Sequence, residues 1–236
     1  MTSTALVTGG SRGIGRAIVE RLAAAGHRVV FTYLRDKVAA DEVVARCPGA
    51  VAVRADQTDV SCLDAMFAPV HDGLDILVNN AAVIVPATIA DVTSEEFDRA
   101  MTANTKVPLL AIARASRLLR DGGRIVNIST INTIAAAPGN VLYCASKAAL
   151  EQVTAVAARE LGPRGITVNT VSPGATDTDL LRANNSAEAL AQSAAEAALG
   201  RLGRPDDVAA VVAFLTTADA GWITGQNIRA TGGLLI

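Results

Sequence analysis

Two side chains suited to acid–base chemistry, Tyr143 and Lys147, stand four residues apart in this sequence. If their segment is helical, both project from the same face of the helix, one turn apart. A free tyrosine has a pKa of about 10, and a neighbouring ammonium group lowers that pKa toward neutrality because its positive charge stabilises the phenolate. The pair therefore predicts a general acid and base for a bound substrate. The same spacing also arises by chance on helices, so it acquires meaning only in combination with other motifs.

Three glycines near the N-terminus, Gly9, Gly13 and Gly15, follow the apolar segment 4–8 and precede a helical pattern. Glycine in such a turn allows the backbone to approach a pyrophosphate closely, and the N-terminus of the following helix favours the negative charge of the phosphates. Glycines also make ordinary turns. Their position in the first strand–turn–helix unit of the chain nevertheless favours dinucleotide binding.

The charges after the second apolar segment, 28–33, indicate which dinucleotide binds. NAD-binding proteins place a carboxylate about 20 residues beyond the glycines to bind the ribose 2′-hydroxyl group. Here Arg35 follows the segment and Arg12 lies in the glycine turn, and two guanidinium groups suit a 2′-phosphate. NADP(H) is therefore favoured over NAD(H). Asp36 next to Arg35 leaves NAD(H) open, and both arginines could simply be solvated at the surface.

The remaining pattern supplies the elements that must position these groups. Hydrophobic residues make up 50% of the 236 residues and aromatic residues only 3%, so Ala, Val, Leu and Ile must build a core of parallel strands covered by helices. The alternation of short apolar runs with helical patterns predicts an α/β fold, a single Rossmann-type domain over residues 1–236 with a doubly wound parallel sheet of about seven strands and helices on both faces. Strands are expected at 4–8, 28–33, 50–54, 75–79, 123–129, 165–171 and 226–230, and helices at 15–25, 36–46, 94–119 and 143–161.

Segment 176–204 is longer than a crossover between two strands requires. It is rich in alanine, and Asn184, Asn185 and Ser186 could start a helix. Ligands of α/β sheets bind beyond the carboxyl ends of the strands, so an extra helical segment there predicts a lid over the substrate. The alternative is a surface helical hairpin without a role in binding.

The composition argues against several other classes of function. The net charge is −2 and the basic residues are scattered, which argues against a nucleic-acid partner. Three cysteines, Cys47, Cys62 and Cys144, stand at no metal-ligand spacing and in no disulfide framework, so we predict reduced thiols, no metal site and a cytoplasmic protein. We expect no signal sequence and no membrane span, because no apolar run is long enough.

Ordered motifs along the chain resemble those of the short-chain dehydrogenase/reductase family. They are residues 8–15 (TGGSRGIG), Asp56, residues 79–82 (NNAA), Asn104, residues 128–130 (IST), Tyr143 with Lys147, residues 172–174 (SPG) and Thr178. The resemblance covers the whole chain. It implies an enzyme that transfers a hydride between a nicotinamide cofactor and a carbonyl/alcohol pair.

The resemblance assigns a role to each residue of the catalytic group. Tyr143 would donate its proton to the carbonyl oxygen as the hydride arrives, and Lys147 would bind the nicotinamide ribose and lower the tyrosine pKa. Asn104 would anchor a water that links Lys147 to solvent, with a hydrogen bond inside its helix as the alternative. The family's serine falls at Thr130, 13 residues before the tyrosine, while Ser129 lies one residue earlier and faces the opposite side. We expect Thr130 to serve in place of the serine, with its extra methyl group narrowing the pocket.

The resemblance also implies where the cofactor lies. Asp56 would bind the adenine amino group unless it only shapes a turn, residues 79–82 would pass the adenosine ribose, and Thr178 would bind the nicotinamide carboxamide. Ala82 stands where the family usually has glycine. Together with the charge argument, the expected cofactor-binding residues are Gly9, Ser11, Arg12, Gly13, Ile14, Gly15, Arg35, Asp56, Asn80, Ala81, Tyr143, Lys147, Pro173, Gly174 and Thr178.

The substrate is indicated only by class. Residues 200–205 (GRLGRP) and 223–226 (ITGQ) resemble 3-oxoacyl-[acyl-carrier-protein] reductases, and Arg164 matches an arginine with which such enzymes meet their acidic carrier. A second basic position is Asp121 here, so a carrier-bound ketone and a small-molecule ketone are about equally expected. An NAD-linked alcohol dehydrogenase and a non-catalytic dinucleotide-sensing protein are the other candidates. The resemblance further implies a homotetramer that packs through its C-terminal segment 222–236 and two of its helices.

Overall fold

A single parallel sheet runs through the middle of the computed structural model, which describes residues 3–234. The strand order is β3-β2-β1-β4-β5-β6-β7, and all neighbouring strands in it are parallel. The direction of winding reverses between β1 and β4, so the chain builds the sheet outward in two halves. The prediction of a doubly wound α/β sheet of about seven strands is therefore confirmed. The last two residues of segment 222–236 lie outside the described residues.

The strands match the predicted segments closely. They are β1 Thr4–Val7, β2 Arg28–Tyr33, β3 Val51–Arg54, β4 Leu74–Asn79, β5 Leu119–Ile128, β6 Thr167–Pro173 and β7 Asn227–Ala230. The main difference is that β5 begins at Leu119, which pairs with Leu74 ahead of an irregularity in the register. The strand ends that matter for binding, at the carboxyl edge, lie within two residues of their predicted positions.

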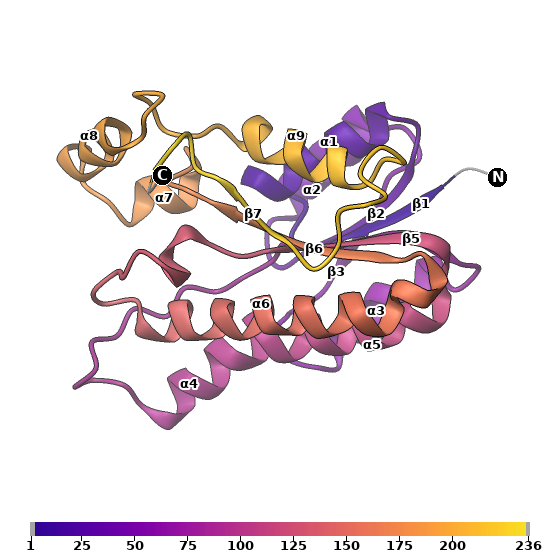
Figure 1. Ribbon diagram of the computed structural model, residues 1–236, viewed down its shortest axis with the longest axis horizontal. Helices are drawn as coiled ribbons and strands as arrows, with labels where there is room; N and C mark the ends of the chain where they lie inside the picture. Colours follow the sequence, from indigo (N-terminus) through magenta and orange to yellow (C-terminus); the bar gives the residue numbers. More distant parts are fainter. Residues whose placement is uncertain (1–2, 235–236) are drawn as a thin grey trace.

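Helices cover both faces of the sheet, with α1, α2 and α9 on one face and α3, α5 and α6 on the other (Figure 1). Beyond these, α4 packs against α6, and α7 and α8 lie past the carboxyl ends of β6 and β7. The helices are α1 Gly13–Ala24, α2 Lys37–Arg46, α3 Cys62–Phe67, α4 Ser94–Met101, α5 Val107–Leu118, α6 Val141–Leu161, α7 Asp179–Ala183, α8 Ala187–Glu196 and α9 Pro205–Leu215, with the short turns η1 Ala68–Val70, η3 Ile131–Thr133 and η4 Gly162–Arg164. Within residues 3–234, none of the helices has the length and apolar character needed to cross a membrane.

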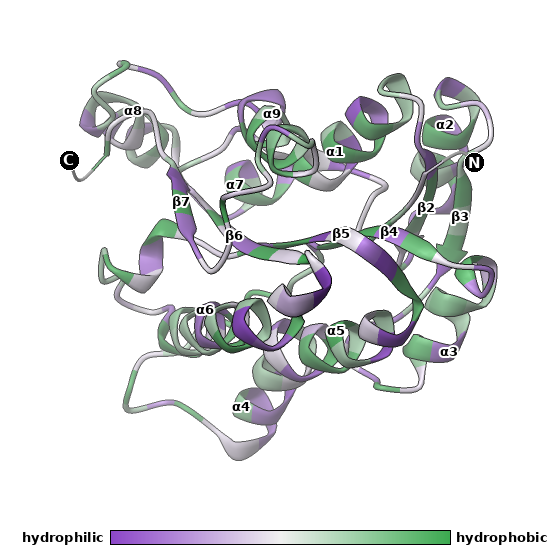
Figure 2. Cartoon of the chain, turned by 45° about the vertical axis from the view of Figure 1, so that its right-hand side comes forward, coloured by the Kyte–Doolittle hydropathy of each residue, from purple (hydrophilic) through white to green (hydrophobic). Residues whose placement is uncertain are grey.

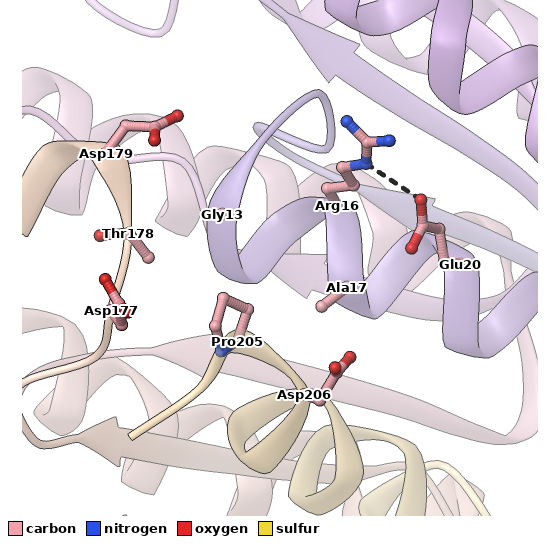
Figure 3. A pocket seen from close by; sticks show the side chains of 9 residues that line it. All are labelled: Gly13, Arg16, Ala17, Glu20, Asp177, Thr178, Asp179, Pro205 and Asp206. Carbon is pink, nitrogen blue, oxygen red and sulfur yellow. Dashed lines mark hydrogen bonds and ion pairs between the residues drawn. The ribbon is translucent and has the colours of Figure 1, made fainter. Parts of the chain in front are cut away.

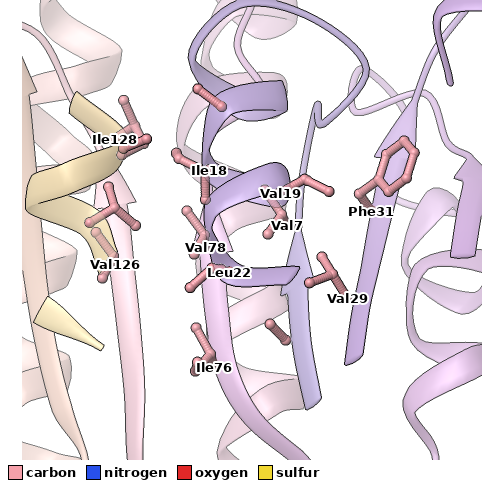
Figure 4. Packing of buried hydrophobic residues seen from close by; sticks show 14 of the residues in the cluster. Val7, Ile18, Val19, Leu22, Val29, Phe31, Ile76, Val78, Val126 and Ile128 are labelled. Atoms are coloured by element: carbon pink, nitrogen blue, oxygen red, sulfur yellow. The ribbon is translucent and has the colours of Figure 1, made fainter. Parts of the chain in front are cut away.

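Two apolar cores, one on each face, hold the sheet in place. In the core under α1 and α9, Ile18 packs with Val7 and Val78 of the two central strands (Figure 4). The core on the other face contains Leu6 and Leu77 from the same strands. Consecutive strand residues thus alternate between the two cores, as the period of a strand requires. Green, hydrophobic residues lie along much of the central strands and on the helices that cover them, whereas the edge strand β7 is mainly purple (Figure 2).

The predicted helix 94–119 is interrupted between α4 and α5. The interruption is η2 (Thr102–Lys106), which has the wide turn of a π-helix. Pro108 accounts for it, because proline has no amide hydrogen and its ring clashes with the carbonyl group four residues earlier, here that of Asn104. Turns of this kind are frequent at functional sites. The prediction of one unbroken helix over 94–119 is therefore wrong, and Pro108 was the signal in the sequence that it overlooked.

Candidate active site

Tyr143 and Lys147 lie one turn apart at the start of α6, at the carboxyl edge of the sheet. Tyr143 is half-buried, whereas Lys147 is only 1% exposed. The ammonium group of Lys147 donates a hydrogen bond of 2.7 Å to the carbonyl oxygen of Ile128, the last residue of β5. It also lies 6.0 Å from the centre of the Tyr143 ring. The structure therefore brings the two predicted catalytic side chains together beside the end of β5.

The pKa values of this pair differ from the expectation drawn from the sequence. Burial raises the pKa of the Tyr143 phenol to about 12, and burial lowers the pKa of the Lys147 ammonium group to about 8. The expected lowering of the tyrosine pKa by its lysine neighbour is therefore wrong for the chain by itself. The physical reason is that loss of water disfavours both charged forms, while the ammonium group bonds to a backbone carbonyl instead of the phenol.

Ser129 and Thr130, which follow β5, have different partners. The Thr130 hydroxyl lies beside the Tyr143 phenol, where a side-chain hydrogen bond opposes the rise in its pKa. It also accepts a hydrogen bond of 3.2 Å from the Asn132 amide. Ser129 instead donates a hydrogen bond of 2.6 Å to the Glu151 carboxylate on α6. The structure thus puts Thr130, and not Ser129, next to the tyrosine.

The Asn104 side chain is fully buried in η2 and is held by structural contacts. Its amide oxygen accepts a hydrogen bond of 2.8 Å from the Val83 amide. Its amide nitrogen donates to the Val83 carbonyl oxygen at 2.9 Å and to Ser146 Oγ at 3.0 Å. These bonds join the segment after β4 to α6 beside the tyrosine. Both polar atoms of the side chain are thus bonded to Val83 and Ser146, outside its own helical turn, and the side chain supports the geometry of the site.

The glycine turn between β1 and α1 forms a cradle that a larger side chain would fill. Gly9 and Gly13 have φ values of +69° and +54°, and a methyl group on Gly9 would lie 2.9 Å from Ala81 Cβ. A methyl group on Gly15 would lie only 2.0 Å from the Gly9 carbonyl oxygen. α1 begins after Arg12 with no side-chain cap and no acidic residue in its first turn, so its first amide groups can bind an anion. The cradle fits a pyrophosphate.

The cradle is held in shape by the segment that follows β4. The Asn80 side chain donates to the carbonyl oxygens of Thr8 and Gly9 at 2.8 and 3.1 Å. The backbone amides of Asn80 and Ala81 donate to Thr8 Oγ1 at 2.9 and 3.0 Å. In the turn itself, Ser11 is buried and Ile14 packs against the core under α1. These predicted cofactor contacts therefore form one rigid unit with the turn.

A hollow of about 310 Å³ opens beside the glycine turn (Figure 3). Gly13 and Arg16 of α1 line one side, Thr178 and Asp179 line the opposite side, and Pro205 of α9 completes the wall. A methyl group on Gly13 would lie 3.3 Å from the Thr178 side chain. The glycine turn, predicted to bind the pyrophosphate, and Thr178, predicted to bind the nicotinamide carboxamide, thus lie close together at the edge of this hollow.

Three arginines lie after neighbouring strands at the expected adenosine end of the site: Arg12 in the turn after β1, Arg35 after β2 and Arg54 at the end of β3. Arg12 and Arg35 are exposed, and Arg54 at the end of β3 donates a hydrogen bond of 3.3 Å to the Leu34 carbonyl oxygen. Asp36, the carboxylate that left NAD(H) open, caps α2 by accepting a hydrogen bond of 2.9 Å from the Ala39 amide. The Asp36 carboxylate is therefore engaged in its own helix, whereas the Asp56 carboxylate is close enough to Arg35 for the positive charge to help lower its pKa.

Asp56 and Thr178 both make the local contacts that were their alternatives in the sequence. Asp56 accepts hydrogen bonds from the Thr58 hydroxyl and amide at 2.7 and 2.9 Å, and these bonds lower the pKa of its carboxyl group. Thr178 caps α7 by accepting a hydrogen bond of 3.2 Å from the Leu181 amide. A hydroxyl that accepts one hydrogen bond can still donate another, so the Thr178 cap leaves a donor for a carboxamide.

Pro173 and Gly174 continue the groove at the end of β6. Pro173 is buried as the last residue of the strand. A methyl group on Gly174 would lie 3.2 Å from Thr231 Cα, so the segment after β7 packs closely on this glycine. The backbone at this point therefore cannot carry a bulky side chain.

Two side chains of the site were missed by the sequence motifs. Arg54 is the last residue of β3. A positive charge at the carboxyl end of a strand could have indicated a contact with the phosphates of the cofactor, because ligands bind at that edge of the sheet. Glu151 follows Lys147 by one helical turn, and this spacing was its only signal.

The sequence and fold are similar to those of known reductases. The family described as Enoyl-(Acyl carrier protein) reductase matches residues 9–235. The 3-oxoacyl-[acyl-carrier-protein] reductase FabG of Staphylococcus aureus is 38% identical over 243 residues, covering 99% of this chain and 98% of that protein. The solved structure of the angucycline C-6 ketoreductase LanV with bound NADP has a TM-score of 0.92 at 41% identity, covering 99% of this chain and 95% of that chain. The solved structure of a short chain dehydrogenase from Burkholderia cenocepacia in complex with NADP has a TM-score of 0.93 at 41% identity. The match covers 99% of this chain and 98% of that chain.

Proposed function

Because the chain belongs to the short-chain dehydrogenase/reductase family, we propose that it is an NADPH-dependent ketoreductase with Tyr143 as its proton donor. The chain is an NAD(P)-dependent oxidoreductase of this family, and the proposal concerns its cofactor preference, its substrate and its residues. The observation that carries the proposal is the grouping of Tyr143, Thr130 and Lys147 at the carboxyl edge of the sheet, where ligands of this fold bind.

The proposed chemistry follows from the contacts of this group. A bound nicotinamide supplies the hydride that reaches the carbonyl carbon. Tyr143 gives its phenolic proton to the carbonyl oxygen, and its raised pKa keeps that proton available at neutral pH. Thr130 donates a hydrogen bond to the same oxygen and holds it in line with the phenol. Lys147 stabilises the phenolate that remains, because a positive charge behind it lowers the cost of the anion.

NADPH is proposed over NADH from the charges at the adenosine end. Arg12 and Arg35 are exposed there, and Arg54 adds a third guanidinium group near the end of β2. Asp36 is engaged as the cap of α2 and is not directed at a ribose. Three guanidinium groups suit a 2′-phosphate. LanV and the Burkholderia protein carry bound NADP in their structures, which supports the same preference.

We propose a free ketone, and not a carrier-bound one, as the substrate. Arg164, the expected carrier contact, forms an ion pair of 2.8 Å with Asp121 and also bonds to the carbonyl oxygens of Ser116 and Leu119. Its guanidinium group is thereby neutralised and holds the junction of α5 and β5. Segment 176–204, with α7 and α8, is proposed as the lid over this substrate, since both helices lie past the carboxyl ends of β6 and β7.

We further propose that the protein acts as a homotetramer in the cytoplasm. Leu109 of α5 and Val156 of α6 are 45% and 59% exposed, and Trp222 ahead of β7 is 99% exposed, so apolar surface is available for association. Cys47, Cys62 and Cys144 are free thiols, which suits a reducing compartment. Light scattering that gives the mass of a single chain would contradict the tetramer.

The proposed function is tested by following NADPH consumption with a panel of cyclic ketones, β-ketoesters and an acyl-carrier-bound β-ketoester. We expect turnover of free ketones with NADPH and much slower turnover with NADH or with the carrier-bound substrate. Tyr143→Phe should bind NADPH with nearly unchanged affinity and lose turnover by a factor of about 1,000 or more. Ketone reduction by Tyr143→Phe at the parent rate would overturn the mechanism, and tight NADPH binding without turnover of any ketone would favour a sensor.

A further inference from the structure

Three consecutive residues at the end of β5 contact three consecutive turns of α6. Thr130 lies beside Tyr143, the Ile128 carbonyl accepts from Lys147, and Ser129 donates to Glu151. The first two contacts belong to the proposed catalytic group. The third contact, at 2.6 Å, is as short as a charge-assisted hydrogen bond between a hydroxyl and a carboxylate, and the proposed mechanism does not use it.

Glu151 lies close to a charge that the interior disfavours. Lys147 is 1% exposed, and the Ile128 carbonyl is its hydrogen-bond partner among residues 3–234. Burial lowers the pKa of its ammonium group to about 8, and the Glu151 carboxylate acts in the opposite direction. The two groups form no direct ion pair in the described part of the chain, so the carboxylate acts through space across one helical turn. Without that charge, the buried amine would lose its proton more readily.

The elements packed against Lys147 bring no comparable charge within residues 3–234. The end of β5 contributes a carbonyl and two hydroxyl groups, and β6 and η3 contain no titratable side chain. In η2 the buried neighbour is the neutral Asn104 amide, while Lys106 is exposed. On α6 itself the other titratable groups nearby are Tyr143 and Cys144, which acts on the tyrosine. Glu151 is therefore the one described side chain whose charge supports the ammonium group.

We propose that Glu151 is a positioning residue whose carboxylate keeps the buried Lys147 in its charged form and, through Ser129, holds the end of β5 against Tyr143. Its importance for turnover rests on the proposed function, because a charged Lys147 matters only if Tyr143 passes through a phenolate. The effect on Lys147 itself is a property of the chain and can be measured without cofactor or substrate.

The direct test is a pH titration of the cofactor-free protein by NMR, with 13C at the ε-carbon of lysine. The chain contains three lysines, Lys37, Lys106 and Lys147, so the spectrum is simple and Lys37→Arg assigns one of the two exposed signals. In Glu151→Gln, which keeps an oxygen to accept from Ser129, we expect the pKa of Lys147 to fall by about 0.5 or more.

The matched control is Glu160→Gln, which removes the same charge from an exposed position on the same helix. It should leave the Lys147 titration unchanged. Ser129→Ala removes only the anchor of the carboxylate, so its effect on the Lys147 pKa should lie between those of the parent and Glu151→Gln. Equal Lys147 pKa values in the parent and in Glu151→Gln would overturn the proposal. A uniform fall in all variants, Glu160→Gln included, would overturn it as well.

A second readout uses the reaction. Ketone reduction requires charged Lys147, so in Glu151→Gln the alkaline limb of the kcat profile should move to lower pH by about the same amount as the NMR titration, while in Glu160→Gln it should not move. A merely structural role would lower the rate at all pH values without moving the limb. If the parent reduces no ketone, the proposed function fails, and the NMR titration still decides the role of Glu151.

Discussion

The end of β5 with η2 and α6, and segment 176–204, both border the proposed site, but they are built in opposite ways. In the first region Asn104 and Lys147 are 0% and 1% exposed, and their bonds reach Val83 and Ile128 in distant parts of the chain. In the second region, α7 and α8 contain no buried residue among those described. Their side-chain bonds are local, such as the pair Asp177–Arg182 at 2.6 Å.

The difference between the two regions suggests separate roles: the end of β5 with η2 and α6 serves the reaction, and segment 176–204 serves the selection of the substrate. Groups held by long-range bonds in the core cannot move without cost, so the acid–base geometry is fixed before anything binds. The ends of segment 176–204 are anchored by backbone bonds such as Asp177 to Gly203 and Leu199 to Gly232, but α7 and α8 between them can change shape, or sequence, without disturbing that geometry. Substitutions in the first region should therefore change stability and rate, and substitutions in α7 and α8 should change substrate affinity with little effect on either.

The largest effect is expected from Asn104→Ala. The change removes the Asn104 side chain that bonds to the Val83 amide and carbonyl groups and to the Ser146 hydroxyl, which keeps its bond to the Tyr143 carbonyl oxygen. The loss of three hydrogen bonds, one of them buried and two partly buried, should lower the free energy of unfolding by about 3 kcal/mol. Urea denaturation measures this change. An effect below about 1 kcal/mol would show that the bonds of Asn104 do not hold η2, α6 and the segment after β4 together.

A somewhat smaller effect, on rate, is expected from Thr130→Ala. Removing a hydrogen-bond donor to the reacting oxygen should lower kcat by about 100-fold, or about 2.7 kcal/mol. Ser129→Ala should lower kcat by about 10-fold or less, because its hydroxyl bonds to Glu151 and not to the tyrosine. A severe loss in Ser129→Ala alone would reverse the assignment of the two residues.

The contrast between locally held and long-range contacts also explains which features could be predicted from the sequence. The alternation of apolar runs and helical patterns leads directly to the sheet, and the glycine turn appears where it was expected between β1 and α1. These features depend on local pattern and on burial, which a sequence displays. The pairing of Tyr143 and Lys147 is a local helical spacing, so it too could be predicted.

What could not be predicted depends on the environment of single groups. The pKa of Tyr143 rises where a fall was expected, because burial outweighs a neighbouring charge, and burial depends on the whole fold. The π turn at η2 is a different case, because Pro108 inside the helical pattern was a visible signal of the break that the prediction of one helix over 94–119 overlooked. The contact of Ser129 with Glu151 joins residues 22 apart in sequence, and no motif indicates it.

The proposed adenosine site lies between the two regions in the size of effect that we expect. Arg35 is exposed, like the residues of α7 and α8, but it is proposed to bind the cofactor. Arg35→Ala should raise the KM for NADPH by about 10-fold, or about 1.4 kcal/mol, through loss of a charged contact with the 2′-phosphate. The KM for NADH should stay unchanged, which makes NADH the internal control. Equal changes in KM for NADPH and NADH would mean that Arg35 does not contact the 2′-phosphate.

The smallest effect is expected in segment 176–204 from Ser186→Ala. Ser186 caps α8 by accepting a hydrogen bond of 3.2 Å from the Ala189 amide, and loss of such a cap costs about 1 kcal/mol of helix stability. Because α8 contributes no buried residue, this cost should remain local. Hydrogen exchange should become faster in α8 by about fivefold, while the midpoint of global unfolding stays the same.

Thr93→Ala is the matched control, since Thr93 caps α4, which packs against α6. There the same loss should spread to the core and lower the midpoint of global unfolding. If Ser186→Ala lowered that midpoint as much as Thr93→Ala, segment 176–204 would unfold together with the rest of the protein. A lid that moves independently of the end of β5, η2 and α6 would then be ruled out. If instead Ser186→Ala changes the KM for ketones and leaves the KM for NADPH unchanged, the segment contacts the substrate alone.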